Sequence, residues 1–386
     1  MNDYVRRVTT PERPVTSRLG QLDIELTERC DNDCIHCCIN LPAGDAAARA
    51  REMTTEEVKE ILRQAADLGC LQVRFTGGEP LLRTDFEELY LCARQLGLRV
   101  LIFTNARRLT THLADLLAGV PPLVPLEVTV YGMHRESYEA VSRIPGSFVQ
   151  FRRGVDLLLG RQVPFVVKGA LLPPNGDEMN DFEEWAATIP EMTRPPGYSL
   201  VLDLRNRRDD TARNRQIESL RLTPEEVLAV VARDEATYRR KSADFAARFM
   251  GPPGAELFRC GAGRGLSIDA YGCAQPCMGV RASDLTVDVL ASSLSHALER
   301  FAGLTGICAT NPEYLRRCAS CFLHGFCEQC PAKSWAEHGT LDTPVEYLCS
   351  VAHVQARYLG WLDEGENAWR VAEWRGRVAD ETVRGR

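Results

Sequence analysis

Apolar runs of strand length alternate with helix-like segments between residues 20 and 204. Each strand with its following helix takes about 30 residues, which suits right-handed crossovers between parallel strands. Six such units predict an open (β/α)6 partial barrel of the α/β class, with its ligand site at the carboxyl ends of the strands. The six expected strands are LDIELT (22–27), LQVRFT (71–76), LRVLIFT (98–104), LEVTVY (126–131), PFVVKGA (164–170) and YSLVLDL (198–204).

Local signals mark the ends of the helices between these strands. Thr54 with Glu57, and Thr84 with Glu87, fit capping boxes at helix starts. Glycines at positions 69, 97 and 160 lie where helices are expected to end. The alternation of strand and helix is therefore supported at both ends of several helices.

The second half of the chain has a different pattern. Thr223, Pro224 and Glu226 predict the start of one long bridging helix, and GPPG at 251–254 breaks the chain after it. The following stretch is punctuated by cysteines, and a tryptophan-bearing tail then predicts a docked terminal helix. The expected parts are an N-terminal arm (1–19), the barrel (20–204), a bridging helix region (205–255), a cysteine-rich domain (256–350) and a helical tail (351–386).

Composition narrows the class of protein. The formal net charge is -7, which argues against a nucleic-acid binder because phosphate contacts need a basic surface. The chain shows no signal peptide and no long apolar run, so we expect a cytoplasmic protein without a membrane partner. Disulfides are rare in the cytosol, so 15 cysteines point to metal or redox chemistry.

The first cysteine cluster follows the first expected strand. Cys30, Cys34 and Cys37 form C-x3-C-x2-C in TERCDNDCIHCC. Three thiolates on one loop can hold three corners of an iron–sulfur cube and leave one iron open to an amino-acid-like cofactor. Zinc, with water or another residue as fourth ligand, is the alternative for these three cysteines taken alone.

This motif in a partial barrel resembles the radical S-adenosylmethionine (SAM) enzymes. Thr76-Gly77-Gly78-Glu79-Pro80 adds to the resemblance, because the corresponding GGEP segment of that family holds the methionine amino group of SAM. The resemblance implies a TIM-like partial (β/α)6 barrel and one SAM-binding 4Fe-4S cluster on Cys30, Cys34 and Cys37. It implies SAM contacts at His36, Gly77, Gly78, Glu79, Pro80, Thr104, Asn105 and Thr129.

The later cysteines are too many and too widely spaced for one site. Two further cubes, or two zinc ions, are the open choices for them. Their order resembles the SPASM extension of peptide-modifying radical SAM enzymes, although two residues, where that family usually has three, separate Cys327 from Cys330. The resemblance implies an outer auxiliary cluster on Cys318, Cys321, Cys327 and Cys349 and an inner one on Cys260, Cys277 and Cys330. The fourth inner ligand is Cys273, Cys308 or none.

The resemblance also implies a reaction class. Such an oxidoreductase cleaves SAM reductively to a 5'-deoxyadenosyl radical and oxidatively modifies a ribosomally made (RiPP) peptide, by crosslinking or desaturation. Anaerobic sulfatase maturases are the nearest alternative, but they usually have aspartates where Tyr131 and Met278 stand here. Small-metabolite dehydrogenation is a second alternative, and a zinc-stabilised interaction protein is the alternative without catalysis.

Partners follow from the same resemblance. A precursor peptide and an electron donor such as flavodoxin or ferredoxin are expected. Only 29 residues precede Cys30, too few for a leader-binding domain, so a separate leader-binding protein or the barrel itself would recognise a leader. Arginines of the N-terminal arm and of RNRRDDTARNR suit an acidic peptide or a solvated face.

No residue is assigned as the catalytic acid or base. His134, Asp177, Glu178, Asp203 and Asp269 lie near strand ends or in the cysteine-rich region, and each is as compatible with a structural role. Lys168 is expected to meet either the cofactor carboxylate or a helix carboxylate.

Overall fold

The computed structural model describes residues 19–260 and 262–384, which divide into two compact units. The first contains the residues up to 199 with 212–220 and 262–302, and the second contains the remainder. The sequence predicted one cysteine-rich domain over 256–350, whereas residues 262–302 join the sheet of the first unit. The compact units therefore differ from the predicted division, because this segment pairs with the free edge of the first strand.

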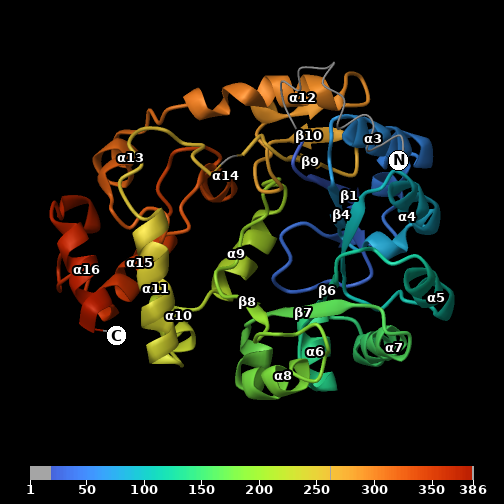
Figure 1. Ribbon diagram of the computed structural model, residues 1–386, viewed down its shortest axis with the longest axis horizontal. Coiled ribbons are helices and arrows are strands. Elements are labelled where there is room, and N and C mark those ends of the chain that lie inside the picture. The colour runs from blue at the N-terminus through green and yellow to red at the C-terminus, as the bar shows by residue number, and fades with distance from the viewer. Residues whose placement is uncertain (1–18, 261, 385–386) are drawn as a thin grey trace. The chain divides into compact units, whose positions relative to one another are not determined.

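In the described part of the first unit, one sheet of nine strands carries the fold (Figure 1). The strand order is β11-β10-β9-β1-β4-β5-β6-β7-β8, and the six strands from β1 to β8 are parallel neighbours in chain order. This is the predicted arrangement of a partial barrel, and the α/β fold class is confirmed. The six strands are β1 (Leu22–Thr27), β4 (Gln72–Gly77), β5 (Arg99–Thr104), β6 (Leu126–Val130), β7 (Phe165–Ala170) and β8 (Gly197–Ser199).

Two features of the sheet were not predicted. Strand β8 ends at Ser199 although the apolar pattern runs to 204, because residues 200–211 fold with the second unit, where Lys333 binds Asp203. Three short strands extend the other edge, with β9 parallel to β1 and the next two antiparallel. These strands are β9 (Leu266–Ile268), β10 (Cys273–Gln275) and β11 (Val287–Asp288).

Helices connect the parallel strands and lie along the outer side of the sheet (Figure 1). The capping box of Thr54 with Glu57 is confirmed, but the one predicted for Thr84 with Glu87 is wrong. Arg83 and Thr55 both bind the Asp85 carboxylate, and the helix starts one residue later, at Phe86. The helices of this unit are α2 (Ala46–Arg51), α3 (Thr55–Asp67), α4 (Phe86–Gln95), α5 (Thr111–Gly119), α6 (Arg135–Ser142), α7 (Ser147–Gly160), α8 (Met179–Ala186) and α12 (Leu294–Phe301), with α9 (Thr211–Ser219) largely in it.

The two faces of the sheet differ in polarity. Successive side chains of a strand point to opposite faces, and one face carries fully buried residues such as Leu22, Ile24 and Val128. The other face is polar, and its charged side chains pair across strands. Parallel strands covered on both faces are normally apolar throughout, so the polar face marks the uncovered, inner side of the partial barrel.

The second unit is mainly helical. The predicted single bridging helix is two helices, because the Asp234 side chain accepts the Thr237 backbone N–H at 3.0 Å and caps a new start. Trp361 and Trp374 are buried with Phe322 in the apolar core of this unit, as the predicted docking of the tail requires. Its helices are α10 (Pro224–Val231), α11 (Glu235–Phe249), α13 (Pro312–Arg316), α14 (Pro331–His338), α15 (Glu346–Tyr358) and α16 (Trp374–Arg384).

Candidate functional site

The loop bearing Cys30, Cys34 and Cys37 begins at the carboxyl end of β1. The Cys37 backbone N–H donates to the Cys34 carbonyl at 3.1 Å, which folds the loop back on itself. Burial has the largest effect on Cys30 and raises its pKa. Charge on Cys34 or Cys37 would raise it further, because these two thiols lie close to that of Cys30. Three sulfurs thus gather on one short loop, as the sequence predicted.

Two glycines allow the end of the neighbouring strand, β4, to pack closely against this loop. A Cβ atom on Gly77 would lie 2.1 Å from the Thr27 carbonyl oxygen, and one on Gly78 would lie 2.2 Å from that of Arg29. Gly77 also has a φ of +123°, which favours glycine. The absence of a Cβ at these two positions therefore lets β4 approach the backbone that leads into Cys30.

Glu79 is the buried carboxylate of the site. Its Oε1 accepts hydrogen bonds from the Thr104 hydroxyl at 2.8 Å and the Leu81 N–H at 3.1 Å, and Oε2 accepts from the Asn105 N–H at 2.8 Å. Burial, followed by the charge of Asp31, raises the pKa of Glu79 to about 7. A carboxylate in this position has a strong preference for a cationic partner.

Three of the predicted SAM contacts lie together. Glu79, Thr104 and Asn105 lie together beside the cysteine loop, and the Asn105 amide donates to Asp31 at 2.9 Å and approaches the Cys30 sulfur at 3.9 Å. Pro80 begins a buried 3-10 turn directly after Glu79, while Thr129 is a half-buried residue on the polar face of β6. Thr104 and Asn105 thus hold the carboxylate and the loop in place.

His36 lies between the last two cysteines, and its ring is 5.9 Å from that of Tyr131. Its Nδ1 atom is buried without a hydrogen-bond partner. Burial, with a smaller effect of Arg213, lowers the pKa of His36 to about 4, so the ring is neutral near pH 7. A neutral ring with an unpaired nitrogen fits contact with a bound heterocycle.

Sequence reasoning missed several residues that hold the loop. Asp31 is bound by Arg107 and Arg108, and Asp33 by Arg143 and Arg213. The Tyr131 hydroxyl is hydrogen-bonded to the Cys34 thiol. The position of Asp31 and Asp33 between Cys30 and Cys34 was the available signal for these arginines. Carboxylates this near a set of thiolates need cations to offset their charge.

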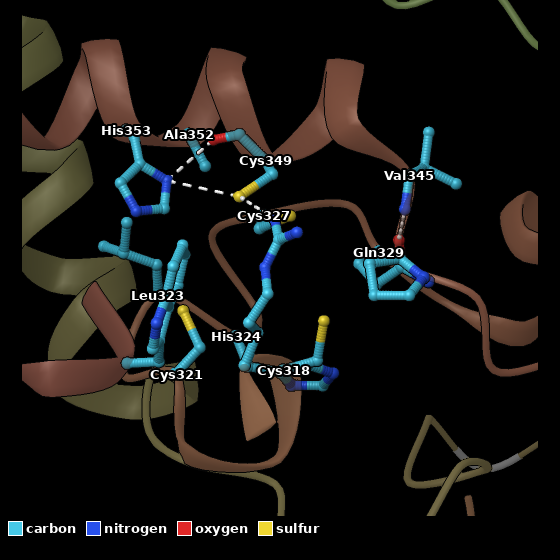
Figure 2. Close-up of a pocket in the computed structure, with 13 residues that line it drawn as sticks. Cys318, Cys321, Leu323, His324, Cys327, Gln329, Val345, Cys349, Ala352 and His353 are labelled. Carbon is cyan, nitrogen blue, oxygen red and sulfur yellow. Dashed lines mark hydrogen bonds between the residues drawn. The ribbon is translucent and has the colours of Figure 1, made fainter. Parts of the chain in front are cut away.

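A second set of thiols lines a cavity in the second unit (Figure 2). Cys318, Cys321 and Cys327 come from the turn and loop after α13, and Cys349 comes from α15. The cavity has about 430 Å³ of empty space, part of it open to solvent. Figure 2 shows the sulfurs of Cys318 and Cys321 on the side facing the α15 helix that bears Cys349. These are the four cysteines predicted for the outer cluster.

The donor chemistry of both cysteine sets suits iron–sulfur clusters. Burial raises the pKa of Cys318 and of Cys321 to about 12, and it raises the pKa values of Cys34, Cys327 and Cys349 as well. Thiols gathered in such a setting ionise readily only against the positive charge of bound iron. The residues present therefore fit one cluster on each set, with three and four protein ligands.

The remaining cysteines are distributed over both units. Cys260 and Cys330 lie in the second unit, where charge on Cys260 contributes to raising the pKa of Cys330, after burial. Cys277 and Cys273 belong to the first unit, and Cys308 is exposed in the second. The predicted inner cluster stays a prediction.

The candidate acid–base residues have structural partners. Asp203 binds Lys333, and Asp269 accepts the Tyr271 and Cys273 N–H groups at 3.0 and 2.9 Å. Glu178 accepts the Met133 N–H at 2.6 Å. Asp177, Asp203 and His134 are exposed, and the His134 Nε2 is 3.5 Å from Asp181.

Lys168 is paired, and so are two arginines of the RNRRDDTARNR segment, Arg205 and Arg208. Lys168 binds Glu127 of the neighbouring strand at 2.7 Å, where the sequence left a cofactor or helix carboxylate open. Arg205 binds Asp209, and Arg208 donates to two carbonyls of α14. The arginines at positions 6, 7, 13 and 18 of the N-terminal arm lie outside the described residues.

Over residues 19–260 and 262–384, no group of three or more His, Cys, Asp and Glu side chains is arranged to hold a single metal ion. Among the same residues, no helix has the length and apolar character needed to cross a membrane.

The fold and site together define a class: an α/β partial barrel with a three-cysteine loop after its first strand and a buried glutamate after the next. Residues 24–189 match the radical SAM superfamily, and this part of the chain is a radical SAM domain. The resemblance seen in the sequence is confirmed there.

Two curated relatives each match less than half of this chain. The AdoMet-dependent heme synthase of Methanosarcina barkeri is 31% identical over 167 residues, which cover 43% of this chain and 46% of the relative. The PqqA peptide cyclase of Xanthomonas axonopodis pv. citri is 30% identical over 188 residues, covering 48% and 49%. The chain thus matches about half the length of these relatives.

Solved structures are similar over more of the chain. The native anSMEcpe structure with bound AdoMet and Cp18Cys peptide has a TM-score of 0.61 at 13% identity, and the match covers 88% of this chain and 96% of that one. SuiB of Streptococcus suis bound to S-adenosylmethionine has a TM-score of 0.60 at 16% identity, covering 86% and 77%. At such identities the likeness concerns the fold alone.

Proposed function

We propose that this protein is a radical SAM enzyme that oxidatively modifies a ribosomally made peptide, with SAM as cosubstrate and an auxiliary 4Fe-4S cluster on the outer cysteine set. The observation that carries the proposal is the gathering of Cys30, Cys34 and Cys37 on one loop beside Glu79. When bound, the cluster and SAM supply a 5'-deoxyadenosyl radical that abstracts hydrogen from an unactivated carbon.

The chain's own residues would bind and orient SAM. The three thiolates leave one iron of a cube open, which is where the amino and carboxylate groups of the methionine part would bind. Glu79 would accept a hydrogen bond from the N–H of that amino group, and positive charge nearby would offset the burial that raises the pKa of this carboxyl. His36, with its unpaired Nδ1, would contact the adenine.

Two observations favour a peptide over the alternatives. A PqqA peptide cyclase is among the relatives, and one similar solved structure holds a peptide. Four cysteines line the outer cavity. Small-molecule dehydrogenases of this superfamily usually carry a shorter extension, so these four cysteines favour a peptide substrate. Met278, which binds no proton, makes the sulfatase-type oxidation less favoured. An electron donor such as flavodoxin or ferredoxin, and a separate leader-binding protein, complete the proposal.

The first test is SAM cleavage by anaerobically reconstituted protein. Replacing Cys30, Cys34 and Cys37 with alanine should abolish 5'-deoxyadenosine formation, measured by liquid chromatography. Cys92→Ala is the matched control, because this half-buried cysteine lies within helix α4 and should leave the product unchanged. Persistence of 5'-deoxyadenosine in the triple variant would contradict the proposed mechanism.

The peptide is tested separately. Co-expression with small open reading frames encoded near the gene should give a peptide that has lost two hydrogens, seen by mass spectrometry. Cys349→Ala should still cleave SAM but fail to modify that peptide. Oxidation of a serine or cysteine to an aldehyde would instead support the sulfatase-maturase alternative.

A further inference from the structure

Cys349 is held differently from the other cysteines of the outer set. Cys321 is hydrogen-bonded by the backbone N–H groups of Leu323 and His324. The Cys349 sulfur instead lies 3.5 Å from two side-chain nitrogens, Nη2 of Arg317 and Nδ1 of His353. Figure 2 shows His353 and Cys349 on the same helix above the other sulfurs. One corner of the set is therefore approached by two side-chain groups.

The hydrogen bonds of His353 determine where its proton lies. Its Nε2 faces the Ala368 backbone N–H at 3.2 Å and must accept, so Nδ1 carries the hydrogen of the neutral ring. The Nδ1–H donates to the Cys349 carbonyl at 2.8 Å and is shared with the sulfur. His353 is thus a neutral N–H donor to Cys349.

Arg317 is fixed from three sides. Both nitrogens of its fork bind the Glu346 carboxylate, at 2.6 and 2.9 Å. Its guanidinium carbon lies 4.8 Å from the centre of the Trp369 ring, and the same ring lies edge-on to His353 at 5.5 Å. Glu346, Cys349 and His353 are spaced three and four residues apart on α15, so they share one helix face. A single tryptophan thus supports both nitrogen donors.

Hydrogen bonds and positive charge at a cluster thiolate favour the reduced cluster, because one-electron reduction adds a negative charge without breaking a bond. We propose that Arg317 and His353 are positioning residues that hold the Cys349 thiolate and raise the reduction potential of the outer cluster. This inference rests on the proposed outer cluster. It assigns no contact with SAM or peptide to either residue.

The experiment measures the potential of the outer cluster directly. The full chain with alanine at Cys30, Cys34 and Cys37 is reconstituted with iron and sulfide, and it is titrated with dithionite while electron paramagnetic resonance follows the reduced clusters. The signal that Cys349→Ala removes is assigned to the outer cluster. Iron content and the visible absorption of that variant show independently whether the outer cluster exists, so a failed premise is distinguished from a failed inference.

Arg317→Gln should lower the midpoint potential of this signal by an amount equal to at least a tenfold change in the one-electron equilibrium constant, about 59 mV. Arg316→Gln is the matched control, since Arg316 is 68% exposed and binds Glu313. Arg317→Lys keeps the charge but loses the fork, and it should give an intermediate potential. A potential in Arg317→Gln equal to that of the control, with iron retained, would overturn the proposal.

His353→Phe provides a second measurement if Arg317→Gln fails to keep iron. This change removes the N–H donor without altering charge and retains an aromatic ring beside Trp369. We expect a fall in potential smaller than that from Arg317→Gln. An unchanged potential in His353→Phe, where Arg317→Gln has lost the cluster, would also reject the proposal, because only a structural role would then remain.

Discussion

At the first site, burial determines the protonation state of a single residue, His36. His36 is neutral near pH 7 because burial lowers its pKa to about 4, whereas the unfolded chain has the ordinary value of 6.5. The folded state therefore binds fewer protons than the unfolded state between these two pH values. Stability from this group is fully present above pH 6.5 and is lost as the pH falls toward 4.

Replacement of His36 should change the acid sensitivity of the cofactor-free protein. The wild-type protein should lose up to about 3 kcal/mol of unfolding free energy from this group on acidification from pH 7 to pH 4. His36→Phe has no titrating ring and should show a shallower fall of Tm over that range, measured by calorimetry. The exposed His112, changed to Phe, is the control. Equal pH profiles for His36→Phe and wild type would contradict the burial argument.

At the scale of elements, the end of β4 is built against the backbone of the cysteine loop. The Gly78 N–H donates to the Thr27 carbonyl at 2.7 Å, and the Glu79 N–H donates to that of Arg29 at 2.9 Å. These bonds join the glutamate and Cys30 segments into one frame. The position of the loop is thus set by two adjacent strands.

A methyl group at Gly78 should disturb this frame. Gly78→Ala places a carbon 2.2 Å from the Arg29 carbonyl oxygen, and we expect a loss of about 1–3 kcal/mol of stability and poorer iron incorporation at the first site. Gly44→Ala is the control, because a Cβ there meets no atom within 4 Å. Thermal unfolding and iron analysis check both. Normal iron content in Gly78→Ala would show that the loop tolerates displacement.

The pattern of apolar and polar residues predicted helices and strands well where no other local signal competed with it. Five of the six parallel strands are of this kind, and β1 has the predicted bounds, whereas β8 ends at Ser199. Prediction failed at two helix starts, where the Asp85 carboxylate is bound by Arg83 and Thr55 and the Asp234 side chain caps a new helix. It also failed for the three strands of two or three residues after 262, which are too short to show alternation and form because β1 offers them an edge.

At the scale of the whole molecule, each compact unit carries its own cysteine set on its own core. The C-x3-C-x2-C spacing grouped Cys30, Cys34 and Cys37, and the resemblance to the SPASM extension implied the outer set. The supports were not predictable. Arg317 directly precedes Cys318 but contacts Cys349, and Trp369 and the arginines around Asp31 also reach their partners through tertiary packing. The expected ligand sets thus come from a motif and a family resemblance, and their environment comes from the fold.

The core of the second unit should control retention of the outer cluster. Trp361 is 1% exposed and packs edge-on against Phe326, the neighbour of Cys327, at 5.2 Å. Trp361→Ala should cost about 3–5 kcal/mol and lower the iron content while SAM cleavage persists. Phe249→Ala, at a residue 62% exposed, should change neither. Full iron content in Trp361→Ala would show that the cysteine loop does not depend on this core.

The unequal faces of the sheet also protect the protein from misfolding. If β7 slipped by one residue along β6, Lys168 would move beneath the helix layer and Val167 would be left in water. Placing an unpaired ammonium among apolar side chains is strongly unfavourable, so a misregistered sheet is penalised at every charged position at once. The charged side chains that line the inside of the barrel thereby favour the correct register between neighbouring strands.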